Sequence, residues 1–164
     1  MSDSEPAPMP TRRPNGARAL ATLERLLVDD GWAPQPDGPA AFRFAHRGSS
    51  ASFDLRAVVL VDAELLLVSA EAPTHVPPAR RPAAAEYILR AGCGLYVGSL
   101  EFDLDSGVAR ARCGLDFEGE PLSPRLARNA IATVIRLMET YLPGLQAVVA
   151  GDDPRRALAA AEGR

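Results

Sequence analysis

Two histidines and two cysteines are the side chains of this sequence that could bind a metal ion or act as a nucleophile. His46 and His75 have no second ligand at helical or hairpin spacing, and a metal site needs clustered His, Cys or acidic side chains. Cys93 and Cys113 do not form a Cys-x-x-Cys pair, and a disulfide between them is not expected in a cytoplasmic chain. We therefore predict no metal site, expect both histidines to face solvent, and expect Cys113 to be a small buried apolar residue.

The sequence also lacks the motifs of a catalytic nucleophile or a phosphate loop. It contains no Gly-x-Ser-x-Gly elbow, and because all 18 basic residues are Arg, a catalytic lysine, a Schiff base and a P-loop are excluded. The run Gly92-Cys93-Gly94, together with Cys113, leaves a thiol-dependent enzyme as the weakest hypothesis. Trp32 is expected to cover the core, with a ligand-stacking role as the alternative. We predict no catalytic residue and no cofactor.

Length, charge and hydropathy are typical of a small acidic protein of the cytoplasm. The 164 residues suffice for one domain, and the net charge of −3 argues against direct binding of nucleic acid. The apolar runs 57–61 and 65–68 are far shorter than the roughly 20 residues that span a bilayer, and the first residues lack the apolar core of a secretory signal. We expect a disordered tail over residues 1–16. Residues 17–164 are expected to form a single α+β domain that includes a short C-terminal helical extension.

Four segments have the apolar spacing or the end signals of helices. The third is the best marked, because Ser123-Pro124 offers a capping hydroxyl followed by proline at the first helical position. We expect Pro143-Gly144 to end it at Tyr141 and residues 145–150 to form a separate helical turn. The expected helices are 17–28, a segment from 78 or 82 to 91, 124–141 and 155–162.

Alternating side chains predict strands in hairpins between these helices. A turn at Gly48-Ser49 would place Phe44 opposite Phe53 on one face and Arg43 opposite Asp54 on the other. The resulting order is α-βββ-α-ββ-α, followed by the helical extension. Helices gathered on one face of an antiparallel sheet make this an α+β fold.

The last hairpin is predicted to have one apolar face and one charged face. With Ser106-Gly107 as the turn, Asp103 lies opposite Arg110 and Glu101 lies opposite Arg112. The two acidic residues are therefore interpreted as members of a ladder of opposite charges and not as a catalytic pair.

A turn at Asp62-Ala63 gives the second hairpin apolar side chains on both faces. Val58 then lies opposite Leu67, and Leu60 lies opposite Leu65, on the face away from the other apolar residues. A contiguous exposed apolar patch commonly marks an interface. We predict that these four residues belong to a partner-binding or dimer surface, with burial inside the monomer as the alternative.

The second helix is predicted to begin with a basic end. Arg80 and Arg81 are assigned to the same partner-binding or dimer surface, where they would contact acidic segments of a partner, and a solvated helix start is the alternative.

The order of elements and several strings resemble the YbjN-like family, described as bacterial sensory transduction regulators. The strings are Asp30-Gly31-Trp32, the strand and proline segment Leu66–Pro77, the run Gly94–Asp103, and Leu122-Ser123-Pro124 through Tyr141–Leu145. The resemblance covers residues 17–150 and implies a fold similar to class I type III secretion chaperones, which are small acidic homodimers that bind partner proteins without catalysis. It offers no catalytic motif, and it implies a broad link to stress responses.

The favoured hypothesis is a non-catalytic, cytoplasmic, homodimeric protein-binding module, chaperone-like or adaptor in role. It would recognise an apolar segment of a partner protein, without a membrane or nucleic-acid contact. The alternative is a regulator that senses a small molecule in a cleft between helix and sheet.

Overall fold

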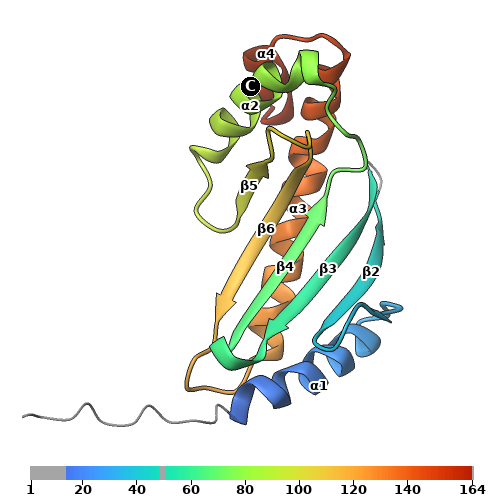
Figure 1. Ribbon diagram of the computed structural model, residues 1–164, viewed down its shortest axis with the longest axis vertical. Coiled ribbons are helices and arrows are strands. Elements are labelled where there is room, and N and C mark those ends of the chain that lie inside the picture. The colour runs from blue at the N-terminus through green and yellow to red at the C-terminus, as the bar shows by residue number, and fades with distance from the viewer. Residues whose placement is uncertain (1–13, 49–50, 164) are drawn as a thin grey trace, which may run out of the picture.

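Antiparallel strands backed by helices build the chain over residues 14–48 and 51–163, the part that the computed structural model describes (Figure 1). Within these residues the helices are α1 (Pro14–Asp29), α2 (Arg81–Gly92), α3 (Pro124–Ala150) and α4 (Pro154–Ala161), with short 3-10 turns η1 (Val61–Ala63) and η2 (Pro78–Arg80). The strands are β1 (Gln35–Pro36), β2 (Ala41–Arg47), β3 (Ser52–Leu60), β4 (Leu65–Glu71), β5 (Ser99–Phe102) and β6 (Ala109–Asp116). They form one sheet in the order β1-β2-β3-β4-β6-β5.

The predicted α+β fold is confirmed. The predicted tail lies outside the described residues up to position 13, and α1 begins at Pro14, three residues before the expected helix.

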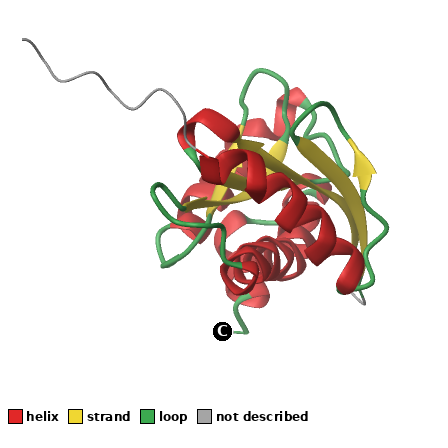
Figure 2. Ribbon diagram, turned by 90° about the horizontal axis from the view of Figure 1, so that it is seen from below, coloured by secondary structure: helices red, strands yellow, loops and turns green. Residues whose placement is uncertain are grey.

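The helices lie on one face of the sheet. Figure 2 shows α1 and the long α3 on one side of the strands, while α2 and α4 pack around the C-terminal end of α3 in Figure 1. Strand residues that point toward α3, such as Phe44, Leu55 and Val68, are buried, and their neighbours in sequence are exposed or half-buried. No described helix covers the second face, which we call the open face.

The first hairpin has the predicted faces but a different register. His46 lies opposite Phe53, and Phe44 lies opposite Leu55, so the predicted pairing of Phe44 with Phe53 is wrong by two residues. Four residues connect the strands instead of two, because the Gly48 N–H donates to the Ala51 carbonyl at 3.0 Å. Ser49, half of the predicted turn, lies outside the described residues.

The corrected register places Arg43 opposite Arg56 instead of Asp54. Two guanidinium groups directly across a pair of strands would repel each other. Asp37, in the loop after β1, forms ion pairs with both and compensates this repulsion. Its hydrogen bond with Arg56 lowers the pKa of Asp37 below the ordinary value, with Arg43 adding to the effect.

The β3–β4 register is confirmed, and the β5–β6 register is not. Phe102 lies opposite Ala109 and Glu101 opposite Arg110, two residues away from the predicted pairing. Asp103 is not a ladder partner of Arg110, because its carboxylate closes the turn by accepting hydrogen bonds from the Asp105 N–H and the Ser106 hydroxyl. Glu101 still contacts two arginines, Arg110 at 3.5 Å and Arg112 at 2.7 Å.

Helix α3 does not end at Tyr141, and the predicted break at Pro143 is wrong. Proline inside a helix costs about 3 kcal/mol because it removes one hydrogen bond and crowds the preceding turn. The helix nevertheless continues to Ala150, with Leu142, Leu145 and Val148 buried in the core, and burial of such side chains contributes about 1.5–3 kcal/mol each.

The segment beyond the proline is also held by a side chain of α2. The Tyr87 hydroxyl donates to the Tyr141 carbonyl at 2.9 Å. Burial raises the pKa of Tyr87, so the hydroxyl stays protonated and remains a donor. Gly144 makes this approach possible, because a Cβ atom there would lie 2.2 Å from the Tyr87 hydroxyl oxygen.

Glu64 joins three segments at the η1 end of the sheet. The residue is 1% exposed and has a left-handed backbone with φ of 52°. Its carboxylate accepts hydrogen bonds from the Asn15 N–H in the first turn of α1 at 3.2 Å and from the Gly119 N–H in the loop before α3 at 2.8 Å. The Glu64 carbonyl accepts a third from the Phe117 N–H at 3.0 Å. A buried carboxylate therefore satisfies backbone donors from two segments that are distant in sequence.

We expect Glu64→Ala to lower the free energy of unfolding by about 1–3 kcal/mol, because the Asn15 and Gly119 amides lose their acceptor. Glu64→Gln, which keeps one acceptor oxygen, should lose less. Urea denaturation followed by circular dichroism measures both variants. Equal stability of Glu64→Ala and the unsubstituted chain would contradict the role given to the carboxylate.

Helices α1 and α3 are also joined by an ion pair. The Asp30 carboxylate, just past the end of α1, accepts two hydrogen bonds from Arg128 of α3, from Nε at 2.7 Å and from an Nη atom at 2.8 Å. The hydrogen bond with Arg128 holds the pKa of Asp30 below its ordinary value of 3.8.

Because this pKa is lower in the folded than in the unfolded chain, ionised Asp30 stabilises the fold. Its contribution is present above the ordinary pKa and is lost as the pH falls through the lowered one. The pair is largely exposed, so we expect Asp30→Asn to cost less than about 1 kcal/mol at neutral pH. The difference should shrink as the pH falls below the ordinary pKa of 3.8, in urea titrations at neutral and acidic pH with Asp29→Asn as the control. A difference independent of pH would contradict the assignment.

Candidate functional site

Four apolar side chains lie together on the open face, at the end of the sheet next to η1. We call Val58, Leu60, Leu65 and Leu67 the apolar patch. Val58 pairs with Leu67, and Leu60 with Leu65, as predicted. Leu60 is 40% exposed, and the other three side chains are half-buried. The next strand adds Gly114 opposite Leu67, where the absence of a side chain leaves the edge of the patch uncovered.

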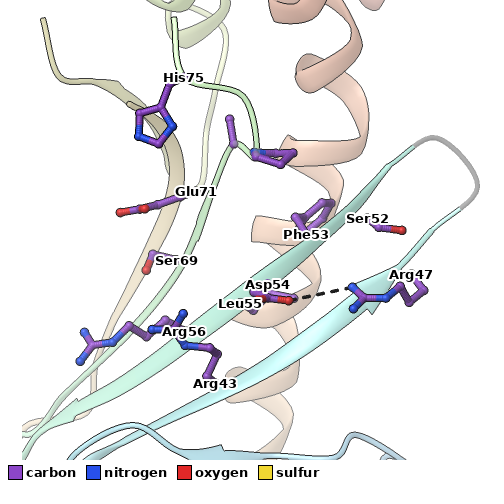
Figure 3. A pocket seen from close by; sticks show the side chains of 12 residues that line it. Arg43, Arg47, Ser52, Phe53, Asp54, Leu55, Arg56, Ser69, Glu71 and His75 are labelled. Carbon is purple, nitrogen blue, oxygen red and sulfur yellow. Dashed lines mark ion pairs between the residues drawn. The ribbon is translucent and has the colours of Figure 1, made fainter. Parts of the chain in front are cut away.

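The other half of the open face is charged. A shallow depression of about 570 Å³ crosses β2, β3 and β4 there, and Figure 3 shows Arg43, Arg47 and Arg56 in it beside Glu71 and His75. Arg47 forms an ion pair with Asp54 at 3.9 Å. His75 is exposed, as the sequence predicts. The open face therefore combines an apolar end with a polar end that carries both signs of charge.

Arg80 and Arg81 lie at the opposite end of the molecule from the apolar patch (Figure 1). Arg80 donates to the Val148 carbonyl in the last turn of α3 and to the Asp152 carbonyl beyond it. A cation at the C-terminal end of a helix is stabilised by the unpaired carbonyl groups there. The guanidinium of Arg80 therefore binds the chain's own backbone between α3 and α4.

Arg81 has a similar environment. It donates to the carbonyl of Val76 before α2 and to those of Leu104 and Asp105 in the β5–β6 turn. The structure therefore does not bring the two arginines together with the four apolar residues of the same predicted surface.

His46 is not the solvent-facing residue that the sequence analysis expects. Its Nε2 atom lies 2.9 Å from the Glu139 carboxylate of α3, and the side chain is 17% exposed. The reason is its position two residues after Phe44, on the face of β2 that points to α3. Trp32 packs edge-on against Phe44, with ring centroids 5.2 Å apart, so it covers the core as predicted.

The two thiols have opposite environments. Cys93 is exposed after α2, whereas Cys113 is buried in β6 and both are free. Burial raises the pKa of Cys113, which keeps the thiol protonated and unreactive. Cys113 has no partner in β5, because that strand begins at Ser99 opposite Arg112 and does not extend to Cys113.

The described elements contain no metal centre, and the cavity enclosed between the sheet, α2 and α3 is small. Over residues 14–48 and 51–163, no group of three His, Cys, Asp or Glu side chains is placed to hold a metal ion. A cavity between the sheet, α2 and α3, lined by Ile88 and Leu137 among others, measures about 20 Å³. It could hold about one water molecule, whereas small-molecule sites occupy about 300–1,000 Å³. None of the described helices has the length and hydropathy to cross a bilayer.

These features define an α+β protein whose distinctive surface is the uncovered face of an antiparallel sheet. The chain belongs to the YbjN family: the family profile, described as "Putative bacterial sensory transduction regulator", matches residues 19–147. The resemblance drawn from the sequence is thereby confirmed. No curated protein sequence matches the chain significantly.

Solved structures share the fold at low sequence identity. YbjN from E. coli, described as a putative transcription regulator, is 17% identical, with 78% of this chain and 90% of that chain covered and a TM-score of 0.56. An uncharacterized protein from Methanothermobacter thermautotrophicus is 14% identical, with coverages of 80% and 96% and a TM-score of 0.51. The HopA1-SchA chaperone-effector complex contains a chain that is 19% identical, with coverages of 74% and 88% and a TM-score of 0.43. At these identities the likeness is one of fold.

We expect a thiol reagent such as Ellman's reagent, used near neutral pH, to modify Cys93 rapidly and Cys113 only after unfolding in urea, since the first thiol is exposed and the second is buried. The absorbance change should correspond to one thiol in the native chain and a second in urea. Cys93→Ser should abolish the fast reaction. Rapid modification of Cys113 in the native Cys93→Ser chain would contradict the assigned burial.

Proposed function

We propose that this chain is a non-catalytic protein-binding module, chaperone-like or adaptor in role, that recognises a segment of a partner protein on the open face of its sheet. The observation that carries the proposal is the apolar patch, four apolar side chains in two adjacent cross-strand pairs on a face that no described helix covers. The description of the family as regulators supports a role in regulation through binding.

The patch offers both binding energy and selectivity. Complete burial of a Leu or Val side chain contributes about 1.5–3 kcal/mol, and partly exposed side chains retain a fraction of this for a partner. The charged half of the open face, with Arg43, Arg47, Asp54 and Arg56, favours partners whose polar residues follow an apolar stretch.

We extend the proposal to the oligomeric state, the location and the cellular process. The module, residues 17–164, acts as a homodimer in the cytoplasm, within a stress response, and without contacting nucleic acid. The acidic net charge of −3 supports the last point, because it provides no basic field for a polyanion.

Leu67→Asp tests the proposal, because it places a charge at the centre of the apolar patch. The matched control is Leu89→Asp, which introduces the same change at a leucine of α2 that is 71% exposed and lies away from the open face. Both variants are first checked for an unchanged circular dichroism spectrum and melting temperature. Partners captured from the native host are identified by mass spectrometry, and their affinity is then measured with purified proteins.

We expect Leu67→Asp to weaken partner binding by at least about tenfold, which corresponds to about 1.4 kcal/mol, and Leu89→Asp to leave it unchanged. Equal binding by both variants would show that the patch is not the recognition surface. If Leu67→Asp alters only the dimer mass in light scattering, with every partner retained, the patch serves self-association and the proposal is wrong.

A further inference from the structure

Strand β6 has a free half-edge next to the apolar patch. Strand β5 pairs only with Ala109–Arg112, and its first residue, Ser99, lies opposite Arg112. The chain before Ser99 turns away from the sheet at Gly98, whose φ of 78° is in the left-handed region. Residues 113–116 of β6 therefore have a neighbouring strand, β4, on one side only, as Figure 1 shows below the start of β5.

The direction of the main-chain groups on this half-edge follows from two hydrogen bonds. The Asp103 N–H donates to the Val108 carbonyl on the β5 side, and the Ala72 N–H donates to the Ala109 carbonyl on the β4 side, each at 2.8 Å. Because successive residues of an antiparallel strand point to alternate neighbours, the N–H and C=O groups of Gly114 and Asp116 point to the free edge. Such groups are a template for one more strand.

A groove runs beside this edge, between β6 and α3. It measures about 500 Å³, and its apolar lining includes Val97, Leu115, Leu126 and Ala130. Val97 is 62% exposed and Leu126 is 48% exposed, although both are apolar. Alternate side chains of an added strand would lie in this groove, and the others would lie on the open face beside Gly114 and the apolar patch.

The two ends of the groove differ in charge. Arg136 lines the end near Val97 and donates to the Thr133 hydroxyl at 3.4 Å, but it forms no ion pair with the residues that the structure describes. At the other end the groove continues into a depression that shares Leu115 and Leu126 and is lined by Asp116 and Glu120. The chemistry that complements this surface is an extended apolar segment with a basic end and an acidic end.

We propose that a partner protein binds by strand addition: an extended segment with alternating apolar residues pairs with Gly114 and Asp116 and fills the groove against α3. This inference rests on the proposed function and specifies the conformation of the partner. Four residues of strand span about 13 Å, the length of the free half-edge.

The sharpest test changes the hydrogen bonding of Gly114 and little else. Gly114→Pro removes the edge-facing N–H, and proline is tolerated where that N–H faces away from the sheet. Gly114→Ala is the matched control, because it keeps the N–H and its Cβ atom would meet only the Leu67 side chain, at 3.5 Å. The probes are peptides selected from a displayed random library on the full-length chain, with affinities measured by fluorescence polarisation.

We expect Gly114→Pro to weaken the selected peptides by about tenfold or more and Gly114→Ala by less than about twofold, where tenfold corresponds to about 1.4 kcal/mol. Methylation of alternate peptide nitrogens should abolish binding, whereas methylation of the intervening ones should not. Bound peptide should also slow hydrogen exchange of the Gly114 and Asp116 amides in the unsubstituted chain, a measurement that does not depend on the folding of Gly114→Pro.

Strand addition is overturned if a folded Gly114→Pro variant binds the peptides with unchanged affinity. It is also overturned if peptide methylation has no effect and the Gly114 and Asp116 amides stay unprotected. A third contradicting outcome is a dimer that Gly114→Pro dissociates while no peptide binds. If peptides or host partners are lost with Leu67→Asp but retained with Gly114→Pro, strand addition fails and the proposed function stands. If no host partner responds to Leu67→Asp, the proposed function itself fails.

Discussion

The packing of α3 across one face of the antiparallel sheet is the contact on which the rest of the structure depends. Phe44, Leu55 and Val68 point into the same layer as Val134 and Leu137 of the helix, and all five are buried. Because the helices gather on this side, the other face of the sheet has to be stable in water by itself. At one end, charged residues provide this stability, including the pairs that Asp37 forms with two arginines. At the other end the side chains are apolar, so the same asymmetry that builds the core also leaves apolar side chains on the uncovered face.

The face of each strand could be predicted from the sequence, but the register of two hairpins could not. A period of two residues assigns every side chain to a face, and a shift of two residues leaves that assignment unchanged. Phe44 is therefore buried as predicted even though its partner is Leu55 and not Phe53. What selects the register is the hydrogen bonding inside each turn, such as the bond from Gly48 to Ala51 and the capping of the last hairpin by Asp103. The pairing within the apolar patch could be predicted from the sequence, because the connection through η1 keeps Leu60 opposite Leu65.

The remaining differences have tertiary causes. An acidic residue in a turn, such as Glu64, is usually exposed to solvent. Its burial depends on the amides of Asn15 and Gly119, and no local sequence pattern indicates that these amides lie nearby. Pro143 is a valid stop signal, but the contact of Tyr87 with the Tyr141 carbonyl and the burial of the following turns outweigh it. The position of His46, in contrast, could have been predicted from the sequence. The alternation that begins at Phe42 places its side chain on the buried face of β2. The free half-edge of β6 follows from the short length of β5, which begins directly after the left-handed residue Gly98.

The order of the strands also has a kinetic consequence. Strands β2, β3 and β4 follow one another and pair as a meander, and β5 pairs with β6 through a six-residue connection, so both units can form from contacts close in sequence. The pairing of β4 with β6 is different, because α2 and β5 lie between them along the chain. Closing this long loop costs chain entropy before any ladder hydrogen bond is gained. We therefore expect the joining of the two preformed units to be the slow step of folding, with α3 docking across their shared seam.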